Sequence, residues 1–191
     1  MRTQILDAAA SLTVKQGWAT LTMARVAAAV GVSRQTVYNE FGAKPALAQA
    51  IVMRELDRFL RKVVAAFDAH PDDPVEGIRS AVYDVLVFAE HNELLHAALT
   101  KTDRSDNDLL ALLTNDSAPL LDSAKRVVAA ALSRHRLPVS SVQLEVCIDL
   151  VVRSILSHVV VPSGTPREIA DGIAWASSQL LRAGHPAPAA G

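Results

Sequence analysis

The chain has 191 residues, of which half are apolar and 4% aromatic, and its formal net charge is −1. Its single cysteine, Cys147, excludes an internal disulfide, and the lack of an apolar run of about 18 residues excludes a membrane-spanning helix. The start MRTQILDAAA enters helical periodicity without a signal-peptide pattern, so we expect a cytoplasmic protein with no membrane partner.

The charges are unevenly distributed along the chain. Residues 1–62 hold nine Lys or Arg against four Asp or Glu, whereas residues 63–191 hold ten against sixteen. A basic region favours phosphate binding, because each neutralised phosphate releases counterions. The first part of the chain is therefore the candidate for contact with nucleic acid.

The segment from Thr22 to Leu47 predicts two short helices joined by a glycine turn. The hydroxyl of Thr22 precedes an apolar-periodic run and can accept from an unpaired backbone N–H, so a helix should begin there. Val26 and Val30 follow at helical spacing. Gly31 should end this helix, because glycine takes the left-handed conformation without a Cβ penalty.

A second short helix should follow directly. Ser33 is its expected N-cap, Val37 and Phe41 fall on one apolar stripe, and Gly42 closes it. Lys44 then begins another helix, where its ammonium lies near unpaired backbone N–H groups and a phosphate is a natural ligand. This arrangement is typical of a helix-turn-helix DNA reader.

Polar side chains occupy the outer face of the second helix, and their types are those that contact DNA. Arginine, glutamine and asparagine can pair with base edges, whereas threonine, tyrosine and lysine more often contact phosphates. A helix pair that served only for packing would explain Gly31 but not this polar row. The predicted base readers are Arg34, Gln35 and Asn39, and the predicted phosphate contacts are Thr22, Thr36, Tyr38 and Lys44, with Ser33 on the same surface.

Over about residues 4–48 the chain resembles the DNA-binding region of the TetR/AcrR-type bacterial transcriptional repressors. Val26 replaces the isoleucine usual in that family and Pro45 replaces an acidic or polar residue, and neither change removes a proposed contact. The base readers vary across the family, so no operator sequence is implied. The most specific marks are Ile5, Ala8, Ala9, Leu12, Gly17, Thr22, Val26, Ala27, Ala29, Gly31, Val32, Ser33, Tyr38, Phe41, Lys44 and Leu47.

Helical periodicity continues from Leu47 to Phe67, and after the loop HPDDP a further helix begins near Pro74. Pro119 should kink or split one of the later helices. The expected fold is all-α with about nine helices. The later ones are expected at residues 92–100, 106–135, 139–161 and 166–183.

This pattern predicts a helix-turn-helix domain over residues 1–48, an effector-binding and dimerisation domain over 49–184, and a flexible tail over 185–191. The long helix after Leu47 links the two domains. A displacement of this long helix would move the helix-turn-helix. The family resemblance implies that the helix transmits the effect of ligand binding from the C-terminal domain.

The segment VQLEVCIDLVVRSILSHVVV is apolar on nearly all sides, which is typical of a helix buried in a core or at an interface. Together with the last helix it predicts a four-helix homodimer interface, as the family resemblance also implies. The predicted interface residues are Val152, Ile155, Val159, Ile169, Ile173, Ala176 and Leu180.

Apolar residues of the middle helices are candidates for an effector pocket, which would suit a small apolar or amphipathic ligand. Any one of these residues is more simply explained as ordinary core, and we expect a subset of them to border a cavity. The candidates are Val82, Leu86, Phe88, Leu95, Leu99, Leu110, Leu113, Leu120 and Leu121.

The polar candidates in the C-terminal region favour structural roles. Asp149 and Arg153 have the spacing of an ion pair on one helix face. His158 has no ligand at metal-coordinating spacing, and the pair His91 and His96 is weaker still, so no metal or cofactor is expected. Cys147, in an apolar helix, is typical of inert core.

These observations predict a ligand-responsive transcriptional regulator, most simply a repressor, that binds a near-palindromic double-stranded DNA operator as a homodimer. The alternative is a helical ligand-binding or interaction protein without sequence-specific DNA binding. An enzyme is not expected, because the sequence has no phosphate loop, nucleophile elbow or catalytic partner set.

Overall fold

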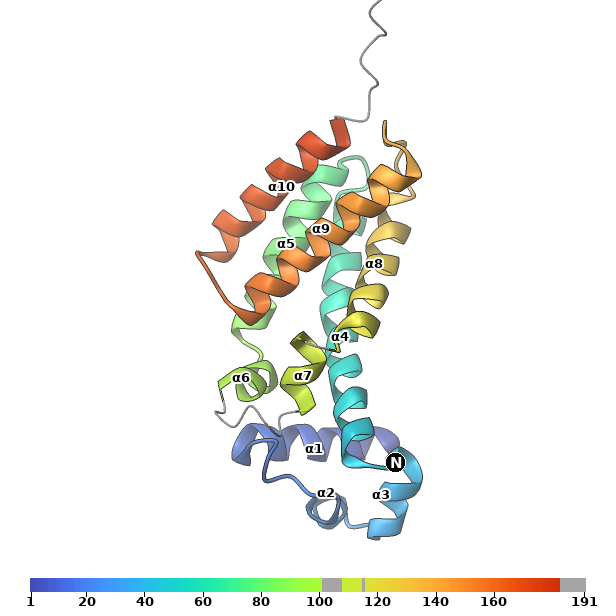
Figure 1. Cartoon of the computed structure of the whole chain (residues 1–191), viewed down its shortest axis with the longest axis vertical. Helices are drawn as coiled ribbons and strands as arrows, with labels where there is room; N and C mark the ends of the chain where they lie inside the picture. The colour runs from blue at the N-terminus through green and yellow to red at the C-terminus, as the bar shows by residue number, and fades with distance from the viewer. Residues whose placement is uncertain (101–107, 115, 183–191) are drawn as a thin grey trace, which may run out of the picture. The chain divides into compact units, whose positions relative to one another are not determined.

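The computed structural model describes residues 1–100, 108–114 and 116–182, which form ten helices and no strand. The all-α prediction is therefore confirmed (Figure 1). The helices are α1 (Arg2–Gln16), α2 (Met23–Val30), α3 (Arg34–Phe41), α4 (Lys44–Ala69), α5 (Pro74–Glu90), α6 (Glu93–Thr100), α7 (Asp108–Thr114), α8 (Ala118–Leu132), α9 (Ser141–Val160) and α10 (Pro166–Arg182).

The structure has one helix more than the nine expected. The sequence predicted a helix over residues 106–135 that Pro119 would kink or split. The helix is split instead of kinked: α7 ends at Thr114 and α8 begins at Ala118. Pro119 lies in the first turn of α8, where the missing N–H has no helical partner to lose. Residues 106–107, the break predicted over 102–106 and the tail over 185–191 lie outside the described residues.

The chain packs as two compact units. The N-terminal unit comprises residues 1–57 and 91–117, and the C-terminal unit comprises residues 58–90 and 118–191. Helix α4 contributes its first half to the former and its second half to the latter. Each described helix is too short or too polar to cross a membrane.

The N-terminal unit has one apolar core beneath its first three helices. Ile5 of α1, Val26 of α2, Val37 of α3 and Ile51 of α4 are completely buried in it. Helices α6 and α7 also belong to this core, through Leu94, Ala98 and Leu109. Helices α6 and α7 therefore pack with the DNA-binding helices, although a linear boundary at residue 48 separates them in the sequence.

A chain of polar contacts joins three helices of this unit. Arg54 of α4 donates to the Asp7 carboxylate of α1 at 2.7 Å, and its neighbour Glu55 accepts from the Asn92 amide at 3.1 Å. The Asn92 side chain also accepts from the backbone N–H of Leu95 at 2.9 Å, so it caps α6. The contacts link the first turn of α6 to α4 and α1.

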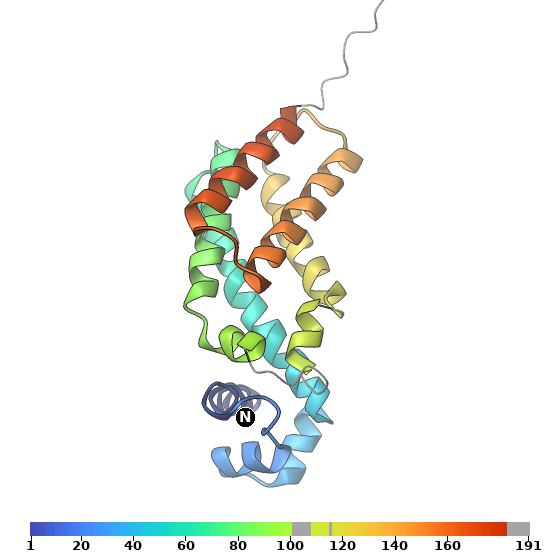
Figure 2. The same cartoon turned by 60° about the vertical axis from the view of Figure 1, so that its left-hand side comes forward.

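In the C-terminal unit, α10 packs along α5, and α9 lies beside both α8 and α10 (Figures 1 and 2). Val82, Leu132 and Ala170 are almost completely buried in its core. The first turn of α5 approaches α4 closely at Gly77, where an added Cβ would lie 2.7 Å from a ring carbon of Phe67.

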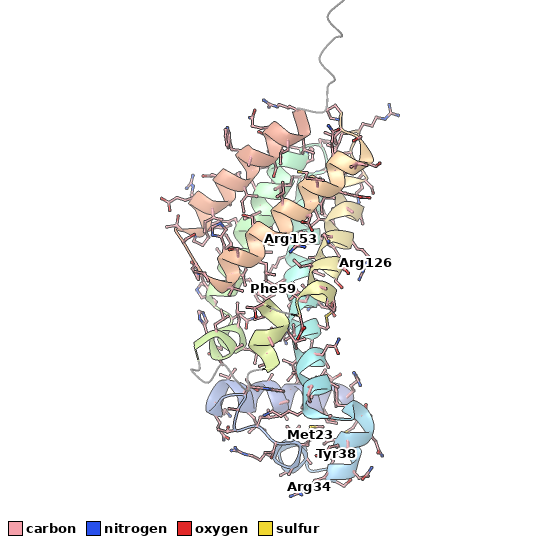
Figure 3. All side chains as sticks on the ribbon, viewed as in Figure 1. Met23, Arg34, Tyr38, Phe59, Arg126 and Arg153 are labelled. Atoms are coloured by element: carbon pink, nitrogen blue, oxygen red, sulfur yellow. The ribbon has the colours of Figure 1, made fainter. Side chains whose placement is uncertain are left out.

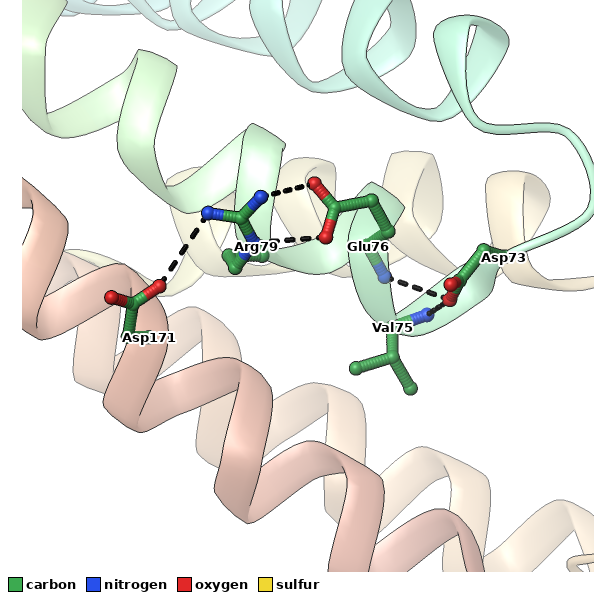
Figure 4. Close-up of polar contacts among 5 residues, drawn as sticks. All are labelled: Asp73, Val75, Glu76, Arg79 and Asp171. Atoms are coloured by element: carbon green, nitrogen blue, oxygen red, sulfur yellow. Dashed lines mark hydrogen bonds and ion pairs between the residues drawn. The ribbon is translucent and has the colours of Figure 1, made fainter.

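A charged cluster fixes the start of α5 against α10 (Figure 4). Asp73 caps α5 by accepting from the backbone N–H groups of Val75 and Glu76 at 3.1 and 3.0 Å. Arg79 donates through Nε to Glu76 at 2.9 Å and reaches Asp171 of α10 at 3.5 Å. The hydrogen bond from Arg79 lowers the pKa of Glu76, which keeps this carboxylate charged.

Candidate DNA-binding surface

Local capping places the two helices as the sequence predicts. The Thr22 hydroxyl accepts from the backbone N–H of Arg25 at 3.3 Å, and α2 begins at the next residue, Met23. Gly31 ends α2 with φ 76° and ψ 31°, the left-handed conformation. The predicted start and end of the first helix are therefore confirmed.

The second helix is held in the same way. Ser33 Oγ accepts from the backbone N–H of Thr36 at 3.1 Å, and the two hydroxyl oxygens lie 2.9 Å apart. Gly42 follows α3 with φ 71°, and α4 begins at Lys44. These short-range interactions fix the turn and both ends of α3, which is what a recognition helix needs to keep one orientation.

Helix α3 has two chemically distinct faces. Val37 and Phe41 are buried, with 0% and 6% of their surfaces exposed, and anchor the helix in the core. Arg34 and Tyr38, both labelled in Figure 3, are exposed, and Tyr38 has 47% of its surface exposed. The predicted DNA contacts Thr22, Ser33, Arg34, Gln35, Tyr38 and Asn39 are all exposed, and Thr36 and Lys44 are half-buried.

The Lys44 ammonium reaches beyond its own helix. Its Nζ lies 5.0 Å from the centroid of the Trp18 ring and 3.5 Å from the carbonyl oxygen of Ala19. From the sequence we expected the Lys44 ammonium to lie beside the unpaired N–H groups at the start of α4. In the structure these contacts hold it at the connection between α1 and α2. The aromatic ring and the carbonyl both stabilise a cation there.

Two arginines of this region were not predicted from the sequence. Arg2 donates to the Glu40 carbonyl at 2.8 Å and stacks 4.3 Å from the Phe41 ring centroid, so a cation lies at the carbonyl end of α3. Arg25 donates to the Thr20 carbonyl at 2.9 Å. The Arg2 contact spans 38 residues and leaves no local sequence signal.

The predicted pocket residues are distributed over both units. Val82, Leu86 and Leu121 are buried in the core of the C-terminal unit, where Leu120 is half-buried. Phe88 packs edge-to-face on Phe59 at 4.8 Å between ring centroids. Leu95, Leu99 and Leu113 are half-buried in the N-terminal unit, and the Leu110 side chain lies outside the described part of the chain.

The predicted interface residues are placed differently from one another. Val152 is buried, and Ile155, Val159, Ile169 and Ile173 are half-buried against the core of their own unit. Ala176 and Leu180 are exposed.

Other apolar residues of the same two helices are the most exposed. They are Val142, Val146 and Leu150 of α9, with 67%, 55% and 53% of their surfaces exposed, and Trp175 of α10, with 67%. We call these four residues the exposed α9–α10 face; sequence reasoning missed it. The i, i+4 spacing of its three α9 residues is the signal that could have found it.

The predicted ion pair between Asp149 and Arg153 is confirmed, with Arg153 Nε 2.7 Å from the carboxylate. Lys125 of α8 joins it at 3.1 Å. These hydrogen bonds, from Arg153 first and Lys125 second, hold the pKa of Asp149 below its ordinary value.

The remaining candidates do not form a reactive or metal site. Cys147 is buried, and desolvation raises the pKa of its thiol, as expected of an inert core cysteine. His158 Nδ1 lies 3.1 Å from the Ser163 hydroxyl, and His91 and His96 are both exposed. Within residues 1–100, 108–114 and 116–182, three His, Cys, Asp or Glu side chains nowhere gather as a metal site.

The capped helix pair, the buried stripe of α3 and its polar outer face define a helix-turn-helix DNA-binding protein. Residues 5–51 match the family model of bacterial regulatory proteins of the tetR family, and residues 73–179 match the C-terminal domain of the bacterial tetracyclin repressor. The chain belongs to the TetR family of bacterial transcriptional regulators. The members of this family are regulators and not enzymes.

A curated relative agrees with this assignment. The chain is 32% identical over 174 residues to the HTH-type transcriptional regulator AlkX of Mycobacterium tuberculosis, covering 91% of this chain and 82% of the relative.

Solved structures show the same fold. The TetR family repressor AlkX of Dietzia sp. strain DQ12-45-1b, implicated in biodegradation of n-alkanes, superposes with a TM-score of 0.77 at 26% identity, covering 96% of this chain and 98% of that one. Thermus thermophilus FadR, solved with lauroyl-CoA, gives a TM-score of 0.62 at 22% identity over 100% of both chains.

Proposed function

We propose that the protein is a cytoplasmic repressor that binds a near-palindromic operator as a homodimer and is released by a small apolar or amphipathic effector. The observation that carries the proposal is the polar outer face of α3, with Arg34, Gln35, Tyr38 and Asn39 exposed above the buried Val37. Side chains of these types on a helix of this motif contact base edges and phosphates in the major groove.

Binding to the upstream DNA of its own gene tests this proposal, with fluorescence anisotropy measured over a series of salt concentrations. Tyr38→Ala and Lys44→Ala should each weaken binding, and Lys44→Ala should reduce the salt slope by about one because it removes a phosphate contact. Arg167 is an exposed basic residue of α10, so Arg167→Ala is the control for the loss of one positive charge. This variant should leave the salt slope of DNA binding unchanged.

Unchanged affinity and salt slope in both Tyr38→Ala and Lys44→Ala would contradict the assigned phosphate contacts. An absence of any sequence preference in the wild-type protein would favour the alternative, a helical ligand-binding or interaction protein that lacks specific DNA recognition.

The exposed α9–α10 face supports the dimer. Its residues are large, apolar and exposed, and they lie on two helices that contact each other, which is typical of an interaction surface. A second copy of the chain suits it, because a two-fold axis presents the same apolar face from both sides. Two recognition helices about 34 Å apart would then meet successive major grooves of the operator.

Analytical ultracentrifugation tests the dimer. Leu150→Glu should shift the protein to monomer, because the interface would have to bury an unpaired charge. Tyr83→Glu is the matched control, since Tyr83 is an exposed aromatic of α5, 43% exposed and outside this face. A Leu150→Glu protein that sediments as the wild type would contradict an interface on this face.

The proposed effector is a long-chain aliphatic compound, such as an n-alkane or a molecule derived from one. The support is the relation to two AlkX regulators, of which the Dietzia protein is implicated in biodegradation of n-alkanes. Within the C-terminal unit, the apolar candidates Leu86, Phe88, Leu120 and Leu121 have the side-chain chemistry that suits such a ligand.

A thermal-shift panel tests the effector class with n-alkanes, fatty acids, acyl-CoAs and cationic drugs. The aliphatic compounds should raise Tm and release bound DNA, because a ligand that binds the folded state stabilises it. Silence from every aliphatic class would contradict this part of the proposal.

A further inference from the structure

Two amide side chains on the outer face of α3 are bonded to each other. Gln35 Nε2 donates to Asn39 Oδ1 at 2.8 Å, across one helical turn, and both residues are exposed. Side chains at i and i+4 are neighbours on a helix surface, so the bond needs no distortion of α3. The two amides therefore present one joint surface to a ligand.

The bond leaves different groups available on the two residues. Gln35 retains its Oε1 acceptor and the second hydrogen of Nε2, whereas the acceptor of Asn39 is engaged by Gln35. In the major groove adenine presents an amino donor beside the N7 acceptor, while guanine presents two acceptors. The acceptor and donor of Gln35 match adenine, whereas one lone pair of the Asn39 carbonyl oxygen is already engaged by Gln35.

The adjacent polar side chains of α3 have other partners. The Thr36 hydroxyl lies 2.9 Å from the Ser33 hydroxyl, and the Glu40 carboxylate lies 3.9 Å from Arg2. These contacts keep both side chains at the ends of the helix. Within the part of the chain that the structure describes, the hydrogen bond to Asn39 is the polar contact that orients the Gln35 side chain.

We propose that Gln35 reads an adenine in each operator half-site, and that Asn39 is a positioning residue that holds the Gln35 amide in the orientation for reading. This inference rests on the proposed operator binding and deepens it to a base preference. A glutamine that is ordered before DNA arrives loses less conformational freedom on binding, so its discrimination between bases increases.

Selection of bound DNA from a random pool tests the proposal with the full-length protein. The wild type should enrich a half-site with adenine at one base pair. Gln35→Ala should reduce that adenine preference by about 5- to 150-fold, the discrimination of one bidentate contact. Asn39→Ala should reduce the preference at the same base pair by about 2- to 12-fold, the cost of ordering one flexible side chain.

Two further variants separate positioning from direct reading. Asn39→Asp retains an acceptor for Gln35 Nε2, so it should keep the adenine preference while its negative charge lowers affinity for every sequence. Arg34→Ala, at the adjacent exposed position, should change the preference at a different base pair. Thermal unfolding checks that each variant remains folded, which the exposure of these positions favours.

The outcomes distinguish the two proposals. A wild-type pool without any enriched motif would overturn operator binding itself. An enriched motif in which Gln35→Ala acts on a base other than adenine would overturn only the adenine assignment. An effect of Asn39→Ala at a base pair that Gln35→Ala leaves unchanged would show that Asn39 reads directly and would overturn its positioning role.

Discussion

The outer face of α3 and the exposed α9–α10 face are both open to solvent, yet their chemistry is opposite. On α3 the apolar Val37 is fully buried and polar side chains face outward, whereas on α10 Trp175 is 67% exposed. A polar face that carries Arg34 suits a hydrated polyanion, and an apolar face suits a partner that excludes water. The contrast supports the proposal that the outer face of α3 binds DNA and that the exposed α9–α10 face binds a second protomer.

The largest expected effect compares two leucines. Leu47 of α4 is completely buried in the core of the N-terminal unit, whereas Leu150 on the exposed α9–α10 face is 53% exposed. Leu47→Ala should lower the free energy of unfolding by about 2–5 kcal/mol, because it leaves a cavity. Leu150→Ala should cost a protomer less than about 0.5 kcal/mol and should weaken only the dimer.

Urea denaturation at two protein concentrations separates these effects. The loss in Leu47→Ala should persist at both concentrations, whereas that in Leu150→Ala should depend on concentration through the dimer equilibrium. A concentration-independent loss in Leu150→Ala would place this side chain in the core of its own protomer.

The next effect compares two helical glycines. A Cβ at Gly77 would lie 2.7 Å from the buried Phe67 ring, whereas a Cβ at Gly172 meets nothing within 4 Å. Gly77→Ala should therefore destabilise by about 1–3 kcal/mol through overpacking. Gly172→Ala should stabilise the protomer by up to about 1 kcal/mol through helix propensity. Chemical denaturation measures both, and equal effects would contradict the packing difference.

A smaller effect is expected from the N-cap residues of α3 and α9, the helices that carry the two surfaces. Ser33 caps α3, and Ser140 caps α9 in a capping box with Gln143. Ser33→Ala and Ser140→Ala should each cost about 0.5–2 kcal/mol. Only Ser33→Ala should also weaken DNA binding, and Ser33→Thr should restore it, because threonine keeps the cap. Equal loss of DNA affinity in both alanine variants would contradict a local role for Ser33.

The smallest effect concerns the Asp149 ion pairs beside the exposed α9–α10 face. Because the pKa of Asp149 is lowered in the folded state, its contribution to stability is present above the ordinary aspartate pKa and is lost as pH falls through the folded value. The stability difference between wild type and Asp149→Asn should disappear in acid and shrink in high salt. A difference that does not vary with pH would contradict this.

The DNA-binding helices could be predicted because their signals are local. Thr22, Gly31 and Ser33 act on backbone groups within a few residues, so their identities alone indicate where α2 and α3 begin and end. The split at Pro119 follows from proline geometry in the same way. The contact of Arg2 with the end of α3 depends on residues far apart in the chain and could not be predicted.

The later helices show the limit of periodicity. Helix α9 is apolar on nearly all sides, so its sequence does not tell which stripe faces its own core. Val152 was assigned to the interface and is buried in its own unit, whereas Val146 was not assigned and is exposed. The packing of α6 and α7 with the first helices depends on Leu94, Ala98 and Leu109, which carry no local signal for that partner.

Because the N-terminal unit is formed by two separate stretches of the chain, its DNA-binding helices are not expected to fold as an independent module. Leu94, Ala98 and Leu109 complete a core that begins with Ile5, so a fragment cut after residue 57 would expose apolar surface that these side chains cover. A chimeric regulator made by one splice near residue 50 would join α1 to foreign versions of α6 and α7. Exchange of DNA specificity between relatives is therefore expected to succeed by replacing the surface residues of α3 in place, and not by grafting the first 50 residues.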